Sequence, residues 1–481
     1  MNRRHFFQSS LALAVAAALP YRRASGAGAA QLSSSDLQGL RGALSGPLIL
    51  PGEAGYDDAR RVLIDTIDRH PALVVQPTGA ADVRTAVTFA RERDLLLAVK
   101  CGGHSDAGFG TCDGGMQLDL SRLRGVRVDP SSRTAYVAGG SLLGELDHEA
   151  MACGLVTTTG TVSHTGVGGL TLGGGYGRLA RRFGLALDNV RAVDIVTADG
   201  RLLHASDKEN ADLYWGVRGG GGNFGVATEF EFALHPMQRQ VIAGSLVFPF
   251  SRLKELLPVY TEFSQHAPDD LYCDFVVSMP AGKDGVVVFS LVYSGAPERA
   301  EAVLAPLRKL GAPIADSIKT KDYVAVQRSG DKTDPRTETV HAHTGFVDEL
   351  NHGLIDALTS GLLPHPQRRA ILFFQHAGGA IGRVAPAATA IPHRHATHNM
   401  VFNVAWPPGI DPAAHIAYSD ELWTRLSRHI NGFYTNEVID EPVSVIEANY
   451  QGNLPRLRAL KKKYDAGNLF RLNANVRPVQ T

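Results

Sequence analysis

Cysteine is scarce in this chain of 481 residues. The four cysteines are Cys101, Cys112, Cys153 and Cys273, and no two of them form a Cys-x-x-Cys pair. Zinc-ribbon sites and disulfide-stapled folds need more cysteines at closer spacing, so the sequence excludes both. A single disulfide remains open if the chain reaches an oxidising compartment.

The chain also lacks an excess of charge, since 48 basic residues balance 48 acidic ones. Proteins that bind nucleic acid or anionic membranes usually carry a basic surface, so we expect neither partner. Three lysines at positions 461–463 fall on a predicted helix, and we interpret them as a solvent-facing side. No segment reaches the roughly 20 apolar residues of a membrane-spanning helix, so no membrane insertion is expected.

The N-terminal residues have the composition of a targeting segment. Arg3 and Arg4 precede two phenylalanines, an alanine-rich apolar stretch spans residues 11–19, and small residues at 27–30 suit a cleavage site. Residues 1–30 resemble a twin-arginine export signal, with an ordinary secretory signal as the alternative. Because the twin-arginine route carries folded proteins, it suits a protein that takes up a cofactor before export. We expect an exported protein, periplasmic or extracellular.

Glycine is abundant and is concentrated in three blocks. The first, Gly102-Gly103-His104-Ser105, follows an apolar run at residues 95–99 that predicts a strand. Glycines without a Cβ let backbone N–H groups approach an anion such as a phosphate. His104 would then lie within reach of the bound ligand, where an imidazole can transfer a proton, ligate a metal or form a covalent bond. A glycine turn followed by a surface histidine is the alternative.

The second block, residues 166–177, holds seven glycines within twelve residues, and the third spans residues 215–225. So much glycine is unfavourable for folding unless the backbone must approach something closely, as it would a dinucleotide. A Rossmann motif is excluded because the segment before the second block, residues 157–165, is polar and no Gly-x-Gly-x-x-Gly opens a helix. A P-loop is excluded because no Gly-Lys-Ser or Gly-Lys-Thr occurs.

The elements around these blocks follow from periodicity and capping. Residues 56–70, 81–93 and 142–153 are predicted helices, the last capped by Ser141. Predicted strands at 71–75 and 95–99 flank the second helix, which gives a βαβ unit that ends at the first glycine block. Residues 188–197 and 202–204 predict a hairpin, and the third block leads into a strand at 226–234.

The three blocks and the C-terminus resemble flavin-linked oxidases of the vanillyl-alcohol-oxidase superfamily, in particular the berberine-bridge-enzyme-like branch. The C-terminal match runs from Leu457 through Tyr464-Asp465 and Asn468-Leu469-Phe470 to Asn473 and Asn475, and the resemblance covers about residues 56–478.

The resemblance implies an α+β fold. It consists of a two-lobed FAD-binding domain of the PCMH type at residues 56–238 and a substrate-binding domain at 239–440 with a large antiparallel sheet covered by helices. Residues 441–481 would return to the FAD domain. Residues 373–383, 391–394 and 400–406 resemble the substrate-domain strands that form the floor over the flavin.

The resemblance also implies the cofactor site. FAD would lie in extended form, joined covalently through its 8α carbon to His104. Members of the branch often make a second link through a cysteine, but Val162 occupies that position here, so a single link is expected. The residues carried over as FAD contacts are Cys101, Gly102, Gly103, His104, Ser105, Gly108, Val162, Gly166, Gly168, Gly169, Gly173, Tyr176, Gly177, Val226, Asn473 and Asn475.

The implied chemistry is hydride transfer from a small-molecule substrate to flavin N5, with dioxygen as the acceptor and hydrogen peroxide as the product. The family's Tyr-x-Asn segment is here Tyr434-Thr435-Asn436-Glu437, which makes Tyr434 and Glu437 the candidate catalytic residues. Two alternatives remain: a dehydrogenase that uses another acceptor, and a non-catalytic binding protein on the same scaffold. His393, His395 and His398 have no cysteine or carboxylate beside them, and no metal site is predicted.

Overall fold

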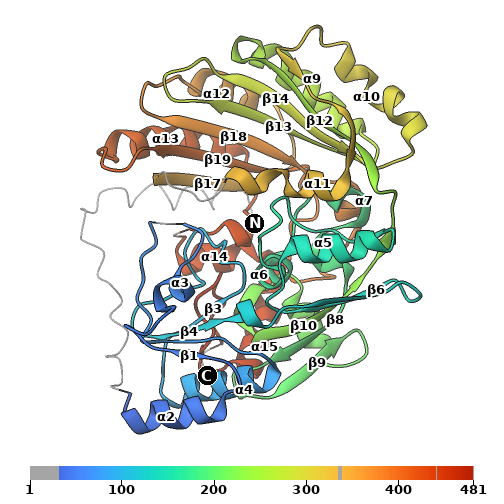
Figure 1. Cartoon of the computed structure of the whole chain (residues 1–481). Coiled ribbons are helices and arrows are strands. Elements are labelled where there is room, and N and C mark those ends of the chain that lie inside the picture. The colour runs from blue at the N-terminus through green and yellow to red at the C-terminus, as the bar shows by residue number, and fades with distance from the viewer. Residues whose placement is uncertain (1–31, 65, 334–338, 440, 480–481) are drawn as a thin grey trace.

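The computed structural model describes residues 32–64, 66–333, 339–439 and 441–479. Two lobes face each other in it (Figure 1): a small-sheet lobe built largely from the first half of the chain, and a large-sheet lobe built from the second half. The predicted export signal at residues 1–30 lies outside the described residues. Within the part of the chain that is described, no helix has both the length and the apolar character needed to cross a membrane.

The first sheet of the small-sheet lobe is mostly parallel. Its strand order is β1-β2-β4-β3, with bounds Leu48–Ile49, Leu73–Val75, Met116–Asp119 and Leu97–Lys100. β2 and β3 both run parallel to β4, which lies between them. Helix α4 (Ala80–Glu92) covers this sheet with Val83, Ala86, Val87 and Ala90, which share one helical face and are fully buried. The predicted βαβ unit therefore exists, but a third strand, β4, lies between its two strands.

The second sheet is antiparallel and contains the predicted hairpin. Its order is β5-β6-β10-β8-β9, with bounds Val126–Asp129, Thr134–Ala138, Val226–Ala233, Val190–Val196 and Leu202–Ser206. Helices α5 (Leu143–Ala152), α6 (Val167–Gly173) and α8 (Ala211–Val217) contribute to its core. The C-terminal helices α14 (Val443–Asn449) and α15 (Leu454–Tyr464) pack into the same core, so the end of the chain returns to this lobe.

The large sheet follows the order β15-β12-β14-β13-β18-β19-β17, and β16 pairs with β12. The bounds, in that order, are Ala315–Asp316, Gln240–Pro249, Val286–Tyr293, Leu271–Met279, Arg369–His376, His398–Trp406, Thr339–Val347 and, for β16, Lys319–Asp322. Every pair in it is antiparallel. This confirms the predicted α+β class with a large antiparallel sheet.

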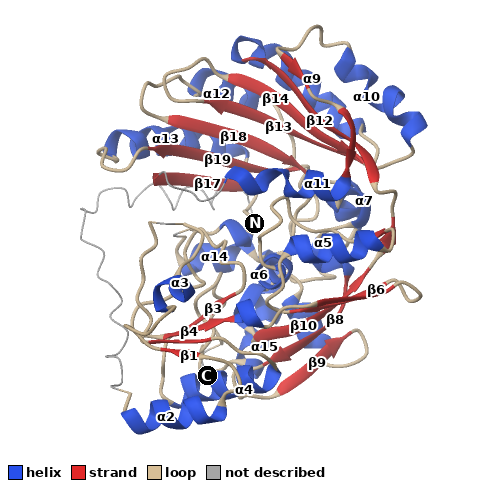
Figure 2. Ribbon diagram, in the orientation of Figure 1, coloured by secondary structure: helices blue, strands red, loops and turns tan. Residues whose placement is uncertain are grey.

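One face of the large sheet is covered by helices, as Figure 2 shows. These are α9 (Leu253–His266), α10 (Ala300–Arg308), α12 (His352–Gly361) and α13 (Ala413–Leu426). Alternate residues of β13, such as Cys273, Phe275 and Val277, are buried against them. The other face turns toward the small-sheet lobe and is free to carry polar residues.

Several sequence predictions of local structure need correction. The predicted helix at 56–70 is only α3 (Tyr56–Arg60), because the chain beyond it runs along the first glycine block, where Leu63 N donates to Gly103 O. Ser141 does not cap α5; its hydroxyl instead bonds the backbone of Gly125. The predicted strand at 188–197 begins only at Val190, after a short 3₁₀ helix (Ala186–Asn189).

A buried ion pair joins the two lobes. Arg394 is not exposed, and its guanidinium donates two hydrogen bonds to the carboxylate of Asp188, at 2.8 and 2.9 Å. The segment 391–394, which was expected to form part of the sheet, is therefore a connection between β18 and β19 that reaches across to the other lobe.

Candidate functional site

A cavity of about 560 Å³ lies between the two lobes, within the range of small-molecule sites. The small-sheet lobe contributes the first glycine block, much of the second and the end of the third. The large sheet contributes residues of β17, β18 and β19, and the last part of the chain contributes residues 434–437 and 472–474. Segments that are far apart in the sequence thus form one site.

The loop after β3 places His104 in the cavity wall. Its Nε2 lies 2.8 Å from Nδ1 of His164, and its Nδ1 lies 3.3 Å from the hydroxyl of Thr165. Both partners come from the segment just before the second glycine block. The imidazole is therefore held by two side chains at the edge of the cavity. This position differs from that of a surface histidine after a glycine turn, which was the alternative interpretation.

The glycines of the site serve two different purposes. A Cβ on Gly102 would come 2.3 Å from the backbone nitrogen of Gly166, so these two glycines let the first and second blocks pack backbone to backbone. Gly169 and Gly221 also line the cavity, but no protein atom lies within 4 Å of where their Cβ would be. Open space in front of a glycine backbone is suited to close contact with a ligand.

The segment that carries Val162 is held by the large-sheet lobe. Ser163 donates to the Asp331 carboxylate from its backbone nitrogen, at 3.0 Å, and from its hydroxyl, at 2.6 Å. Gln327, at the end of α11 (Tyr323–Gln327), donates to the Thr159 hydroxyl at 2.7 Å. The wall of the cavity near Val162 is therefore fixed by contacts between the lobes.

The cysteines do not pair, and all four lie among the described residues as free thiols. Cys101 lines the cavity, and its Sγ donates to the carbonyl of Gly139 at 3.2 Å. Burial raises the pKa of Cys101 to about 11, so its thiol is not a nucleophile at neutral pH. The disulfide that the sequence left open is not formed.

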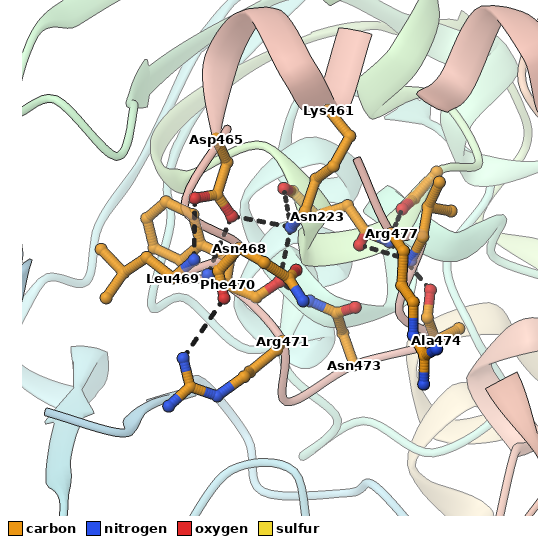
Figure 3. Close-up of polar contacts among 12 residues, drawn as sticks. Asn223, Lys461, Asp465, Asn468, Leu469, Phe470, Arg471, Asn473, Ala474 and Arg477 are labelled. Atoms are coloured by element: carbon orange, nitrogen blue, oxygen red, sulfur yellow. Dashed lines mark hydrogen bonds and ion pairs between the residues drawn. The ribbon is translucent and has the colours of Figure 1, made fainter. Parts of the chain in front are cut away.

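The C-terminal wall of the cavity depends on a buried lysine, shown in Figure 3. Lys461 is fully buried on α15 and donates to the carboxylate of Asp465 and to the carbonyl oxygens of Asn223 and Phe470, at 2.7, 2.8 and 2.8 Å. The interpretation of residues 461–463 as a solvent-facing run is wrong for Lys461, whose ammonium has three acceptors inside the protein. Only its two neighbours in the run are exposed.

Glu437 lies on the large-sheet side of the cavity. Thr344 of β17 donates to its Oε2 at 2.5 Å, and Asn399 of β19 donates to both carboxylate oxygens at 3.1 and 3.2 Å. Asn399 also lies 3.3 Å from Gln375 of β18. The side chains of Gln375, Asn399 and Thr344 therefore form a row of polar groups on the cavity-facing side of the sheet. The row ends at the Glu437 carboxylate.

Tyr434 is buried beside the second glycine block. Its oxygen accepts hydrogen bonds from the backbone nitrogen of Gly175 and from Asn436, both at 2.7 Å. Burial raises the pKa of Tyr434 above its ordinary value, as it does for Tyr176, whose ring centroid is 5.1 Å away. Both phenols therefore stay protonated at neutral pH.

Comparison with known proteins decides the family. Residues 71–206 match the family described as FAD binding domain, and residues 435–477 match the one described as berberine and berberine like. An FAD-linked oxidoreductase of Dictyostelium discoideum is 33% identical over 426 residues, which covers 88% of this chain and 92% of that protein. The chain belongs to the berberine-bridge-enzyme-like FAD-linked oxidoreductases.

Other relatives of this family agree. The (R)-6-hydroxynicotine oxidase of Paenarthrobacter nicotinovorans is 30% identical over 462 residues, covering 90% of this chain and 97% of that protein. The crystal structure of 6-hydroxy-D-nicotine oxidase from Arthrobacter nicotinovorans matches with a TM-score of 0.84 and 28% identity, over 91% of this chain and 98% of that one. The glucooligosaccharide oxidase of Acremonium strictum, with a 6-S-cysteinyl, 8α-N1-histidyl FAD, has a TM-score of 0.81 at 24% identity, over 92% of this chain and all of that one, and shows the fold alone.

The cavity of this FAD-linked oxidoreductase fits its cofactor. Besides the open glycines, two buried side-chain oxygens at the lining residues Asn473 and Tyr176 have no hydrogen-bond partner within the protein. Buried polar groups are nearly always bonded, so such atoms indicate a ligand that supplies the partner. Glycine backbone, amide and hydroxyl groups are suited to a dinucleotide and a flavin ring.

The structure places most of the predicted cofactor residues of the enzyme around this cavity. Those that line it are Cys101, Gly102, Gly103, His104, Ser105, Val162, Gly166, Gly168, Gly169, Tyr176, Val226 and Asn473. The predicted catalytic residues Tyr434 and Glu437 line it as well.

Four predicted contacts of the FAD oxidoreductase do not line the cavity. Gly173 packs against Asn436, and Gly177 packs against the backbone of Thr159, with no room for a Cβ in either place. Gly108 forms a turn with a φ of +69°, and Asn475 lies past the end of the wall. At the three glycine positions the absence of a side chain serves the packing of the protein on itself, which a count of glycines cannot separate from ligand contact.

Sequence reasoning missed the residues of the enzyme that strand pairing brings to the site. Thr344, Gln375 and Asn399 come from three neighbouring strands, and their spacing along the chain gives no signal. Gly221 and Gly222 belong to the third glycine block, which was recognised but not assigned to the cofactor. Of the histidines considered for a metal, His393 bonds the carbonyl of Asn449 and His398 bonds Tyr260, so they point to different partners.

Proposed function

We propose that the protein is an oxidase that removes hydride from a substrate carbon bearing a hydroxyl or amine group and passes the electrons to dioxygen, forming hydrogen peroxide. The observation that carries this proposal is the Glu437 carboxylate on the cavity wall, facing a cofactor site built around His104. The relative that oxidises 6-hydroxynicotine supports an oxidase rather than a binding protein.

Residues of the chain would accept the proton that the substrate hydroxyl or amine releases. Bound FAD supplies the hydride acceptor. A carboxylate oxygen of Glu437 takes the proton from the substrate hydroxyl or amine, while Thr344 and Asn399 hold that carboxylate in place. Tyr434 is less suited to act as the base, because burial keeps its phenol protonated; it orients the loop of Gly175 instead.

We further propose that His104 carries the flavin in a covalent link and that this link is single. His104 lies in the cavity wall, and Val162, at the position of the family's second link, has no thiol. Export by the twin-arginine route is proposed on Arg3 and Arg4, the apolar stretch at residues 11–19 and the small residues at 27–30. Replacing both arginines by lysine and following the protein in cell fractions tests it, because a protein that still leaves the cytoplasm uses another route.

Anaerobic reduction of the flavin tests the catalytic proposal. Candidate alcohols and amines are first screened by peroxide release, and the best one is mixed without oxygen with the wild type and with Glu437→Gln. The variant should bleach about 10²- to 10⁴-fold more slowly, the usual contribution of a general base. Glu349→Gln, which changes an exposed carboxylate, is the matched control.

Three other outcomes would overturn parts of the proposal. Bleaching that Glu437→Gln leaves unchanged removes that residue as the base. Substrate-driven bleaching without peroxide in air indicates a dehydrogenase with another acceptor. A purified protein that holds no flavin even after reconstitution indicates a binding protein.

A further inference from the structure

Two histidines and an aspartate meet on the outer side of the cavity's edge strand. Nε2 of His341 lies 2.8 Å from Oδ1 of Asp420, and Nε2 of His343 lies 3.2 Å from the same oxygen. All three ligand atoms lie within 4.8 Å of one another. Among the residues that the structure describes, no other group of three such side chains is so arranged.

The strand determines which way these histidines face. Side chains alternate along β17, so His341 and His343 share one face, while Ala342 and Thr344 share the other. Thr344 bonds Glu437 in the cavity. The two histidines therefore lie on the opposite face, where α13 supplies Asp420 and packs against the strand.

The histidine rings are already oriented toward a common point. Trp423 of α13 stacks on His343 with 4.9 Å between ring centroids and 6° between planes. The rings of His341 and His343 meet edge to face at 4.8 Å.

The cluster is also accessible to an ion from solvent. The His343 side chain is 18% exposed, that of His341 is 32% exposed and that of Asp420 is 54% exposed. Among the residues that the structure describes, the Asp420 carboxylate pairs with the two histidines and with no lysine or arginine. An approaching cation therefore meets two imidazoles and a carboxylate oxygen directly.

We propose that His341, His343 and Asp420 form a binding site for a divalent cation of the zinc class. Zinc bonds of about 2.0–2.2 Å in a tetrahedron put ligand atoms roughly 3.4 Å apart. The two Nε2–Oδ1 separations here, 2.8 and 3.2 Å, are shorter than that value, so a small outward movement of the side chains would make room for the ion. Mg²⁺ and Ca²⁺ prefer oxygen ligands, so a site with two imidazole nitrogens is less suited to them than to zinc. Three protein ligands leave the fourth position to water.

The ion would connect the edge of the large sheet to its covering helix. β17 is the last strand in the sheet and is hydrogen-bonded on one side only, to β19. Its residues Val340, Ala342 and Thr344 line the cavity, and Thr339 and His343 also border it, although the His343 ring packs against α13. A cross-link from β17 to α13 would therefore stiffen the cavity wall that holds Glu437, whatever reaction takes place there.

Zinc titration of the full chain tests this site. The protein is purified through a tag without histidines, treated with EDTA and desalted, and ZnCl₂ binding is measured by calorimetry. We expect about one equivalent to bind, with the affinity about 100-fold or more weaker in His341→Ala and in Asp420→Asn, since even indirect partners of a metal cost 10- to 100-fold. His352→Ala, which removes an exposed histidine of α12, should bind as the wild type does.

Cobalt gives a second readout that is independent of activity and folding defects. Co²⁺ in the same site should produce visible ligand-field absorption that Zn²⁺ abolishes and that Asp420→Asn lacks. Asp420→Asn keeps the size of an exposed side chain, and an unchanged circular dichroism spectrum shows that it is folded. Zinc binding that both variants leave unchanged, or no saturable binding to the wild type, would overturn the proposal.

Discussion

Lys461 and Asp465 form an ion pair with 2.7 Å between Nζ and Oδ2, and neither side chain is more than 1% exposed. The carboxylate also accepts hydrogen bonds from the backbone nitrogens of Leu469 and Phe470, at 2.8 and 2.9 Å. Together with the bonds from the ammonium to Phe470 and Asn223, this pair fixes the turn that leads into the C-terminal wall of the cavity (Figure 3).

Replacing Lys461 by methionine should lower the free energy of unfolding by about 3–5 kcal/mol, because the charge of Asp465 stays buried without its partner. Urea unfolding measures the change, and Lys462→Met at the exposed neighbouring position is the control. The double variant with Asp465→Leu should recover part of the loss, since no charge is then left unpaired. A single variant as stable as the control would contradict this account.

Replacing His104 by alanine should release the flavin from the denatured protein. Acid precipitation of the wild type should leave the yellow colour in the pellet, whereas that of His104→Ala should leave it in the supernatant. His148→Ala, an exposed histidine on α5, should behave as the wild type does. Colour that leaves the wild-type pellet would mean that FAD is bound without a covalent link.

Introducing a thiol at Val162 should supply a second attachment point. Val162 lines the cavity, and its neighbourhood is fixed by the contacts of Ser163 with Asp331. In the His104→Ala background, Val162→Cys should return flavin colour to the acid pellet, and Val162→Ser should not. Equal release from both would show that position 162 does not reach the flavin ring.

The buried histidine His398 should lower the stability of the folded protein in acid. Burial lowers the pKa of His398 to about 3 from an ordinary 6.5. Between pH 3 and 6.5, His398 is therefore protonated in the unfolded chain but neutral in the folded protein. His398 therefore removes up to about 1.4 kcal/mol of stability for each pH unit below 6.5. Asp147 and Asp274, whose pKa values burial raises to about 7, act in the opposite direction.

The difference between the wild type and His398→Gln isolates this effect. Unfolding free energies measured at several pH values between 7 and 4 should show that the variant gains stability relative to the wild type as the pH falls, while His352→Gln should follow the wild type. Parallel curves for the wild type and His398→Gln would show that this histidine is not held neutral in the folded state.

The sequence predicted what depends on neighbours along the chain. The buried face of α4, the β8–β9 hairpin and the glycine loop of His104 are local patterns, and all three occur. The family resemblance added the fold class, which no local pattern specifies.

Contacts between distant residues could not be predicted in this way. Lys461 resembles a surface lysine in sequence, and one of the three acceptors that make its burial favourable, the carbonyl of Asn223, lies 238 residues earlier. Gly102 and Gly166 resemble ligand-contacting glycines, but each leaves room for the other. His341 and His343 meet Asp420 only because β17 pairs at the sheet edge beneath α13.

The cavity wall formed by Asn473 and Ala474 lies later in the sequence than every other lining residue. Every strand of the sheets in the two lobes precedes this wall in the chain. A chain that ended before residue 465 would therefore keep all of these strands but lack one wall of the cavity.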